Sequence, residues 1–269
     1  MDHISHILYK NKKKSSCALI PFITAGYPSV NFTFQALDAL DKQGADVIEL
    51  GIPYSDALAD GPLIQEASKV AIQNGVNVDK VISILGEVSK RIKTPIIVFT
   101  YYNPILFKGI NIFIKKISQA GAKGLIIPDL PLEEADYVVH LCEINSLELI
   151  FFISPTSSTN RILSIANKSP GCLYLVSSTG VTGLRDSVDD NINNISNNIL
   201  SGSNKMIMLG FGISSPSQVK SLLYSNKNIQ GIVVGSAITK IISECFQQDS
   251  DIISTLSKFC SSMKAATFE

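Results

Sequence analysis

The residues best suited to acid–base chemistry lie in one short segment, ELGIPYSDALADGP, at residues 49–62. Glu49 closes an apolar run that is otherwise typical of a buried strand, and Asp60 follows in a loop of Gly, Pro and Ala. Burial disfavours the charged form of a carboxyl group, so we expect a raised pKa for Glu49 and a role as both acid and base near neutral pH. Asp60, on a loop, is expected to stay ionised and to stabilise developing positive charge, because carboxyl groups in unlike surroundings take different roles.

Other roles for the carboxylates in this region are weaker or equally open. Glu49 could pair with a buried lysine or arginine, but basic residues are rare in the strand-like runs. Asp56 stands in a Ser-Asp step, where capping or turn formation is as good an explanation as chemistry. A magnesium site at Asp56 and Asp60 is a weak alternative, since this spacing is common in loops. Asp129, in PDLP, fits a site residue and a turn residue equally well. We therefore predict catalysis by Glu49 and Asp60 and no metal site.

Glycine-rich segments form a second group of candidate site residues. GFGISS (210–215) and GSAI (235–238) end two successive strand-like runs, and SSTGVTG (177–183) ends an earlier one. Glycine lets the backbone approach an anion closely, and the N–H groups that open a following helix point at it. Each glycine alone could be a turn residue. Together they favour a phosphate site beside an apolar pocket, and hence a substrate with a phosphate tail and an apolar or aromatic head.

The elements that position these residues follow a regular order of apolar runs and amphipathic segments. The runs are continuous and rich in β-branched residues, as in strands buried on both faces. They cover residues 17–26, 46–53, 95–104, 124–131, 147–155, 172–180, 205–212 and 231–237. Eight strands with helical crossovers predict an α/β fold, a closed (β/α)8 TIM barrel formed as one domain by residues 1–269, with an open doubly wound sheet as the alternative.

Several helices are expected outside the simple alternation. They are an N-terminal helix over Met1–Tyr9 that could cover the barrel floor, two stretches after the second strand at 62–75 and 78–92, and a terminal helix at 251–266. The Asn-rich segment 189–198 is predicted to be a surface helix, because its isoleucines are spaced for one apolar face. Active sites of such barrels lie at the carboxyl ends of the strands, where the residues singled out above gather.

Composition narrows the function classes. The 269 residues carry 23 basic and 23 acidic side chains, so the chain lacks the basic surface of a nucleic-acid binder, and KNKKK at 10–14 is better explained as the solvated end of a helix. No run is long enough to span a membrane, and the N-terminus lacks an apolar signal segment. The 5 cysteines are scattered without a CxxC pair, which disfavours zinc and disulfides. We expect a reduced, cytoplasmic enzyme.

Several motifs together make the chain resemble the tryptophan synthase alpha subunit family along essentially its whole length. They are ALIPFITAGYPS (18–29), ELGIPYSDALADGPLIQ (49–65), YYNPI (101–105), IIPDLPLEE (126–134), STGVTG (178–183) and GFGIS (210–214). The resemblance implies a (β/α)8 barrel lyase that cleaves indole-3-glycerol phosphate to indole and glyceraldehyde 3-phosphate. The reaction is a retro-aldol cleavage, in which the indole C3 gains a proton and the side-chain hydroxyl loses one.

The resemblance also implies a role for particular positions. The acid/base glutamate of the family falls on Glu49 and its indole N–H-binding aspartate on Asp60. Its phosphate-binding positions fall on Gly183, Gly212, Gly235 and Ser236. Its indole-pocket and hydroxyl-contact positions fall on Phe22, Tyr102, Ile127, Ile153, Tyr174 and Phe211. Its partner-facing loops include Tyr54, Asp56, Ala57, Gly180 and Thr182.

The implied partner is the tryptophan synthase beta subunit, in an alpha2-beta2 heterotetramer. Pyridoxal phosphate is expected in that partner, and no cofactor in this chain. Where the family usually has Pro-Phe-Ser-Asp-Pro, this chain has PYSDA, so Tyr54 and Ala57 depart from the pattern. Alanine lacks the fixed φ of proline, so a looser loop and altered coupling to the partner are expected. Two rivals stay open, which are another phosphate-binding barrel isomerase and a non-catalytic regulatory barrel subunit.

Overall fold

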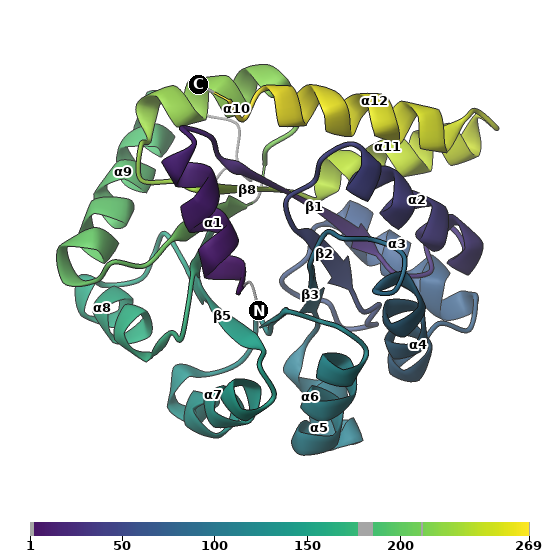
Figure 1. The fold of residues 1–269 in the computed structure, drawn as a ribbon, viewed down its shortest axis with the longest axis horizontal. Helices are drawn as coiled ribbons and strands as arrows, with labels where there is room; N and C mark the ends of the chain where they lie inside the picture. The colour runs from purple at the N-terminus through teal and green to yellow at the C-terminus, as the bar shows by residue number, and fades with distance from the viewer. Residues whose placement is uncertain (1–2, 177–184, 211, 269) are drawn as a thin grey trace.

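Eight parallel strands close into a barrel in chain order, with β8 paired back to β1 (Figure 1). The computed structural model describes residues 3–176, 185–210 and 212–268. The strands are β1 (Ala18–Thr24), β2 (Ile48–Gly51), β3 (Ile96–Phe99), β4 (Gly124–Ile126), β5 (Glu148–Ile153), β6 (Leu173–Val176), β7 (Ile207–Gly210) and β8 (Gly231–Val234). The predicted (β/α)8 barrel is confirmed, and the open sheet is wrong.

Helices surround the barrel and add to the simple alternation. They are α1 (Ile4–Lys13), α2 (Val30–Lys42), α3 (Pro62–Gln73), α4 (Val78–Val88), α5 (Tyr102–Lys108), α6 (Ile110–Gln119), η1 (Leu132–Glu134), α7 (Ala135–Ile144), α8 (Thr159–Lys168), α9 (Arg185–Gly202), α10 (Pro216–Ser225), α11 (Ser236–Gln247) and α12 (Ile252–Ala265). The extra helices at the N-terminus, after β2 and at the C-terminus are confirmed. The apolar face of the Asn-rich segment is confirmed too, because Ile192, Ile195 and Ile199 are buried.

Two segments differ from the sequence prediction. The N-terminal helix runs over Ile4–Lys13 rather than Met1–Tyr9, so the basic cluster forms its last turn and reaches solvent. The run at 95–104 is a strand only as far as Phe99, and YNPILFK after it is α5. Asp129, on the next loop, accepts a hydrogen bond of 2.8 Å from the Tyr102 N–H in the first turn of α5. A cap supplied from another loop left no local signal at Tyr102.

Successive residues of each strand alternate between two apolar clusters. One cluster lies inside the barrel and includes Ile20 and Phe22 of β1, while the other packs between the strands and the helices and includes Leu19 and Ile23. The same alternation runs through β3, β4, β5 and β6. Glu49 lies between Ile48 and Leu50 of the outer cluster, so its side chain belongs to the interior.

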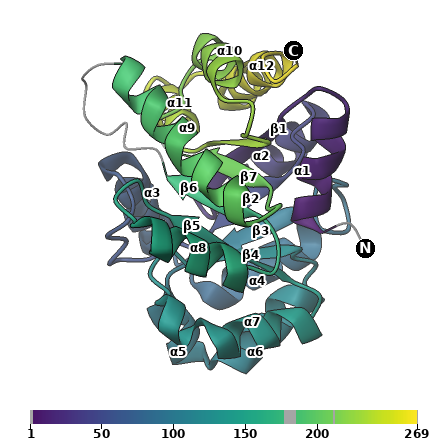
Figure 2. The same cartoon turned by 90° about the vertical axis from the view of Figure 1, so that its left-hand side faces the viewer.

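Helix α1 closes the floor of the barrel, at the amino ends of the strands (Figures 1 and 2). Its Ile4 and Leu8 are fully buried in the interior cluster. Glycines make room for them, because a Cβ at Gly124 would lie 3.2 Å from Ile4 and one at Gly231 would lie 2.9 Å from Leu8. The expected floor-covering helix is therefore confirmed.

A buried carboxylate holds α1 in place. Glu148, at the start of β5, accepts hydrogen bonds from the Ser5 N–H at 3.0 Å and from the Ser5 hydroxyl at 3.0 Å. It also accepts a bond of 2.8 Å from the Cys172 N–H at the entry to β6. A carboxylate at the first turn of a helix satisfies N–H groups that the helix itself leaves unpaired. Glu148 thus joins α1 to two strands.

Candidate active site

Glu49 is the chemical centre of the carboxyl end of the barrel. It is paired in register with Phe22 of β1 and Ile97 of β3, and only 1% of its surface is exposed. Its Oε1 makes no hydrogen bond to any described residue. Burial, aided by the negative charge of Asp60, raises the pKa of Glu49 to about 8. The carboxyl group can therefore exist in both protonation states near neutral pH, as the sequence predicted.

Asp60 lies beside Glu49 and is held by Tyr101. Burial raises the pKa of Asp60 to about 6, and a hydrogen bond from the Tyr101 hydroxyl opposes that rise. The same hydroxyl accepts a bond of 3.0 Å from the Ala59 N–H, so Tyr101 binds the loop at two successive residues. The Gln65 side chain donates to the Asp60 carbonyl at 2.9 Å and fixes the loop from α3. Asp60 is ionised at neutral pH while Glu49 is largely protonated.

Aromatic side chains line the interior around Glu49. Ring centroids lie 5.7 Å apart for Phe22 and Phe99, 6.2 Å for Phe99 and Phe152, and 4.5 Å for Phe152 and Tyr174. Glycines on neighbouring strands leave them room, because a Cβ at Gly210 would lie 2.0 Å from the Tyr174 hydroxyl oxygen. The wall is apolar and aromatic, as a flat aromatic substrate head requires.

Three predicted pocket residues do not share this interior. Tyr102, Ile127 and Ile153 pack in the outer cluster, between the strands and the helices. Their neighbours Tyr101, Ile126 and Phe152 belong to, or pack against, the interior cluster. Each pair differs by one position at or just after the end of a strand, and one step along a strand exchanges the two faces. The period-2 alternation through Glu49 is the signal that could have placed them, because Phe99 and Tyr101 follow Ile97 at intervals of two.

The first turn of helix α11 has no side-chain cap and could bind an anion. Gly235 is its N-cap and makes no side-chain hydrogen bond there, and Ser236 begins the helix. By contrast, the start of α10 is capped by its own side chains, since the Ser215 hydroxyl accepts from the Gln218 N–H and Gln218 accepts from the Ser214 N–H. A helix of 12 residues with an unblocked first turn attracts a phosphate.

The other predicted phosphate and loop positions are only partly described. Gly212, after β7, has a φ of 80°, a conformation that favours glycine, and it is exposed. Phe211, Gly180, Thr182 and Gly183 lie outside the described residues.

The loop after β2 carries the predicted partner-facing residues. Asn103 donates a hydrogen bond of 3.1 Å to the Tyr54 hydroxyl, and the rings of Tyr54 and Tyr101 lie 5.4 Å apart. Ala57 is buried with the interior cluster, whereas Asp56 is exposed and accepts from the Ser55 hydroxyl at 2.7 Å. The Tyr54 hydroxyl thus adds a contact that a phenylalanine cannot make. Among the described residues, no cluster of His, Cys, Asp and Glu could hold a metal ion.

This geometry can be compared with known proteins. The family model described as tryptophan synthase alpha chain matches residues 8–268. A protein of that name from Gracilaria tenuistipitata var. liui is 58% identical, over 98% of this chain and 96% of its own length. The chain belongs to the tryptophan synthase alpha chain family.

Further similarities extend to the fold. The tryptophan synthase alpha chain of Antithamnion sp. is also 58% identical, over 94% of this chain and 95% of that protein. The crystal structure of tryptophan synthase subunit alpha from Legionella pneumophila str. Paris aligns with a TM-score of 0.89 at 33% identity, covering 99% of this chain and 98% of that one. The chain is a lyase of tryptophan biosynthesis and performs the alpha reaction, the cleavage of indole-3-glycerol phosphate to indole and glyceraldehyde 3-phosphate.

Proposed function

We propose that Glu49 is the acid and base of this cleavage and that Asp60 binds the indole N–H. The observation that carries the proposal is the burial of Glu49 beside Asp60, which raises the pKa of Glu49 to about 8. Phe22, Tyr101 and Tyr174 form the wall against which the indole ring packs. Ile126 and Phe152, which belong to or pack against the interior cluster, are proposed to add to that wall. Tyr102, Ile127, Ile153 and Phe211 stay predicted substrate contacts.

The two proton transfers together return Glu49 to its starting protonation state. Protonated Glu49 donates its proton to indole C3, and the carboxylate so formed accepts the proton of the hydroxyl on the adjoining side-chain carbon. The bond from C3 to that carbon breaks, its electrons return to the ring, and the carbon becomes the aldehyde of glyceraldehyde 3-phosphate. Glu49 ends protonated, as it began. Asp60 stabilises the positive charge that protonation places on the indole nitrogen.

The phosphate of the substrate is proposed to bind at the first turn of α11. Gly235 and Ser236 supply backbone N–H groups, with Gly212 and Gly183 on the neighbouring loops. The free N–H groups and the helix dipole attract an anion without a lysine or arginine.

The pH profile follows from the two pKa values. The reaction needs Asp60 ionised and Glu49 protonated. Below a pH of about 6, Asp60 gains a proton, and above a pH of about 8, Glu49 loses its proton. We expect kcat/KM to be highest between these values and to fall tenfold per pH unit beyond each. Initial rates of indole release from pH 5 to 9.5 test this. A flat profile through pH 8 to 9 would contradict the role of Glu49.

Replacing Asp60 by Asn should lower kcat/KM by about 10²-fold, because the amide oxygen still accepts the indole N–H but carries no charge. The acid limb of the profile should vanish with the carboxylate. Asp56→Asn is the matched control, since Asp56 lies exposed on the same loop and should leave isolated-chain activity within about twofold. Equal effects of both changes would show that Asp60 acts only through the loop.

We propose that the partner of the chain is a tryptophan synthase beta subunit, in an alpha2-beta2 heterotetramer, and that indole passes to it. Pyridoxal phosphate then belongs to that subunit. Two apolar side chains support a partner surface at the carboxyl end of the barrel, namely Leu58, which is 89% exposed in the loop after β2, and Phe107, which is 98% exposed in α5. Leu58 lies in the same loop as Tyr54 and Asp56. No helix of the described residues is long and apolar enough to cross a membrane. As a separate proposal, we place the complex in the cytoplasm.

The function is tested by indole release from indole-3-glycerol phosphate, measured for the full chain alone and with the beta subunit of a close relative. We expect slow release alone and at least tenfold faster release with the partner. Release that ignores the partner would keep the chemistry and reject the coupling, with Tyr54 and Ala57 as the first positions to examine. No release in either case, from a folded chain, would favour a regulatory barrel.

A further inference from the structure

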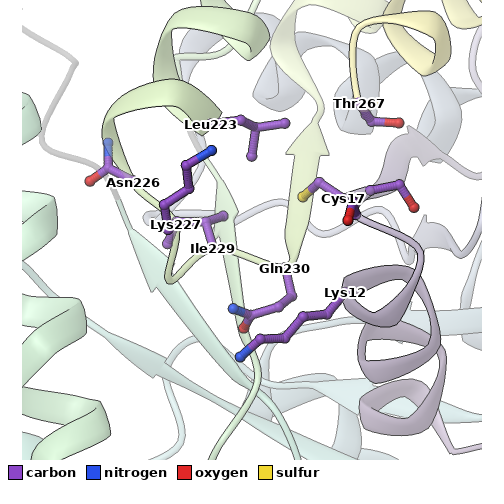
Figure 3. A pocket seen from close by; sticks show the side chains of 10 residues that line it. Lys12, Cys17, Leu223, Asn226, Lys227, Ile229, Gln230 and Thr267 are labelled. Atoms are coloured by element: carbon purple, nitrogen blue, oxygen red, sulfur yellow. The ribbon is translucent and has the colours of Figure 1, made fainter. Parts of the chain in front are cut away.

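Buried polar atoms without a partner among the described residues occur at both ends of the barrel. At the floor, Gln230 and Asn226 each carry one and line a cavity of about 60 Å³, but their side chains point to different parts of it (Figure 3). At the carboxyl end the unpaired atom is Oε1 of Glu49, and the carboxyl group beside it, that of Asp60, does have a partner in Tyr101. The contacts of Tyr101 therefore bear on the reaction directly.

The Tyr101 hydroxyl uses both of its hydrogen-bonding roles on the loop after β2. Its oxygen accepts a bond of 3.0 Å from the Ala59 N–H. A phenolic hydroxyl has a single proton to donate, and Tyr101 donates it to the Asp60 carboxylate. Among the described residues, Tyr101 is the one side chain whose hydrogen bond lowers the pKa of Asp60. The ionised form of Asp60 therefore depends on this hydroxyl.

Tyr101 is itself fixed by elements outside that loop. Its side chain is 4% exposed, and its ring packs edge-on against Phe99 of β3, with the centroids 6.2 Å apart. The next residue, Tyr102, donates its N–H to Asp129 at 2.8 Å, which holds the backbone just after Tyr101. A side chain held by a strand and its neighbours can place a loop residue precisely.

The other contacts of the loop reach its backbone and not its carboxylate. Gln65 of α3 donates to the carbonyls of Asp60 at 2.9 Å and Ala57 at 3.2 Å. The Asp60 N–H donates to the Ala57 carbonyl at 3.1 Å, within the loop itself. Leu58 and Ala59 are exposed. Of the described contacts from outside the loop, the Tyr101 hydroxyl is thus the one that sets the direction of the carboxylate.

We propose that Tyr101 is a positioning residue of the cleavage, whose hydroxyl aims the Asp60 carboxylate at the indole N–H. The inference rests on the proposed role of Asp60. Loss of the hydroxyl leaves the carboxylate without its direction and without the bond that favours its charged form. Because Asp60 acts on charge that develops during the reaction, kcat should fall by more than KM rises.

The groups around Asp60 allow its titration to be followed separately. Glu49 on β2 stays protonated up to a pH of about 8, and the pKa of Tyr174 on β6 lies well above its ordinary value, chiefly through burial. Burial and the charges of Asp60 and Asp129 also raise the pKa of Tyr101, so it remains a donor throughout. Near the Asp60 pKa of about 6, Asp60 is therefore the group among these that changes charge.

The test compares Tyr101→Phe, which keeps the ring and removes the hydroxyl, with the wild-type full chain. Carbon-13 spectra of the aspartate-labelled chain follow the Asp60 carboxyl signal, assigned by its loss in Asp60→Asn. We expect its pKa to rise by about one unit in Tyr101→Phe. The acid limb of kcat/KM should move upward by the same amount, and kcat at pH 7 should fall about three- to tenfold. The basic limb should stay in place, because Tyr101 does not contribute to the pKa of Glu49.

Tyr54→Phe is the matched control. It removes the hydroxyl of the neighbouring ring, 5.4 Å away, and with it the bond from Asn103, but it leaves the contact to Asp60 intact. The Asp60 pKa should then be unchanged. The proposal is overturned if the Asp60 signal of Tyr101→Phe titrates as in the wild type, or if Tyr54→Phe moves it equally, since Tyr101 would then act through packing alone. An acid limb that survives in Asp60→Asn would instead reject the proposed role of Asp60, and the carbon-13 signal would still decide whether Tyr101 holds its carboxylate.

Discussion

Replacing Glu49 by Gln is expected to lower kcat for indole release by at least about 10³-fold, because the amide can neither donate a proton to indole C3 nor accept one from the hydroxyl. Glu49 is buried among apolar side chains, so the isosteric amide should fit without disturbing the wall. Single-turnover release of indole by the purified variant, at pH 7, measures the effect. Near-normal release would reject Glu49 as the acid and base.

The free energy of unfolding of Glu49→Gln provides the control that this variant is folded. Because burial raises the pKa of Glu49 from 4.5 to about 8, the native chain binds the extra proton between these values and loses stability as pH rises through them. Glu49→Gln has no such proton to lose. Its free energy of unfolding should match the wild type near pH 4.5 and exceed it above pH 8, by up to about 5 kcal/mol at about 1.4 kcal/mol per pKa unit. Urea unfolding at the two pH values checks this.

Replacing Glu148 by Ala should lower the free energy of unfolding by about 3 kcal/mol, because it removes a buried side chain and leaves the N–H groups of Ser5 and Cys172 without their acceptor. Helix α1 then loses its attachment to the floor. Activity of the folded fraction should stay within about threefold, since Glu148 and Glu49 lie at opposite ends of the barrel. Chemical unfolding and kcat, measured on the same preparation, test both statements.

Glu143→Ala is the matched control for this change, because Glu143 is an exposed glutamate at the end of α7. Its effect on stability should stay below about 0.5 kcal/mol. If Glu148→Ala were as stable as Glu143→Ala, the floor contacts would contribute little. If it lost activity while remaining folded, the separation between a stabilising floor and a catalytic rim would be wrong.

Most of the fold was predictable because each strand is buried on both faces and so forms a continuous apolar run. The run at 95–104 shows the limit of that rule. Its last residues look like strand, but they form the start of α5, whose first turn is capped by Asp129 from the next loop. A contact between this helix and a distant loop leaves no trace in the local pattern. The same limit explains why Asp129 was equally open as a site or a turn residue.

The site residues could be predicted where a chemically reactive residue type stands at an unexpected position in the sequence. An acid inside an apolar run is unusual enough to single out Glu49, and burial is the main cause of its raised pKa. The aromatic wall was harder, because an apolar run does not say which of its residues face inward. Ile153 and Phe152 are adjacent in the sequence, but only Phe152 packs against the interior cluster.

The measurement that tests the central claim most directly is the titration of the Glu49 carboxyl group. Carbon-13 spectra of the glutamate-labelled chain, compared with those of Glu49→Gln, isolate that one signal. The account predicts that it titrates with a pKa of about 8, so that Glu49 is protonated when it meets the substrate. A pKa near the ordinary 4.5 would mean a permanently ionised carboxylate, unable to protonate indole C3, and would contradict the mechanism.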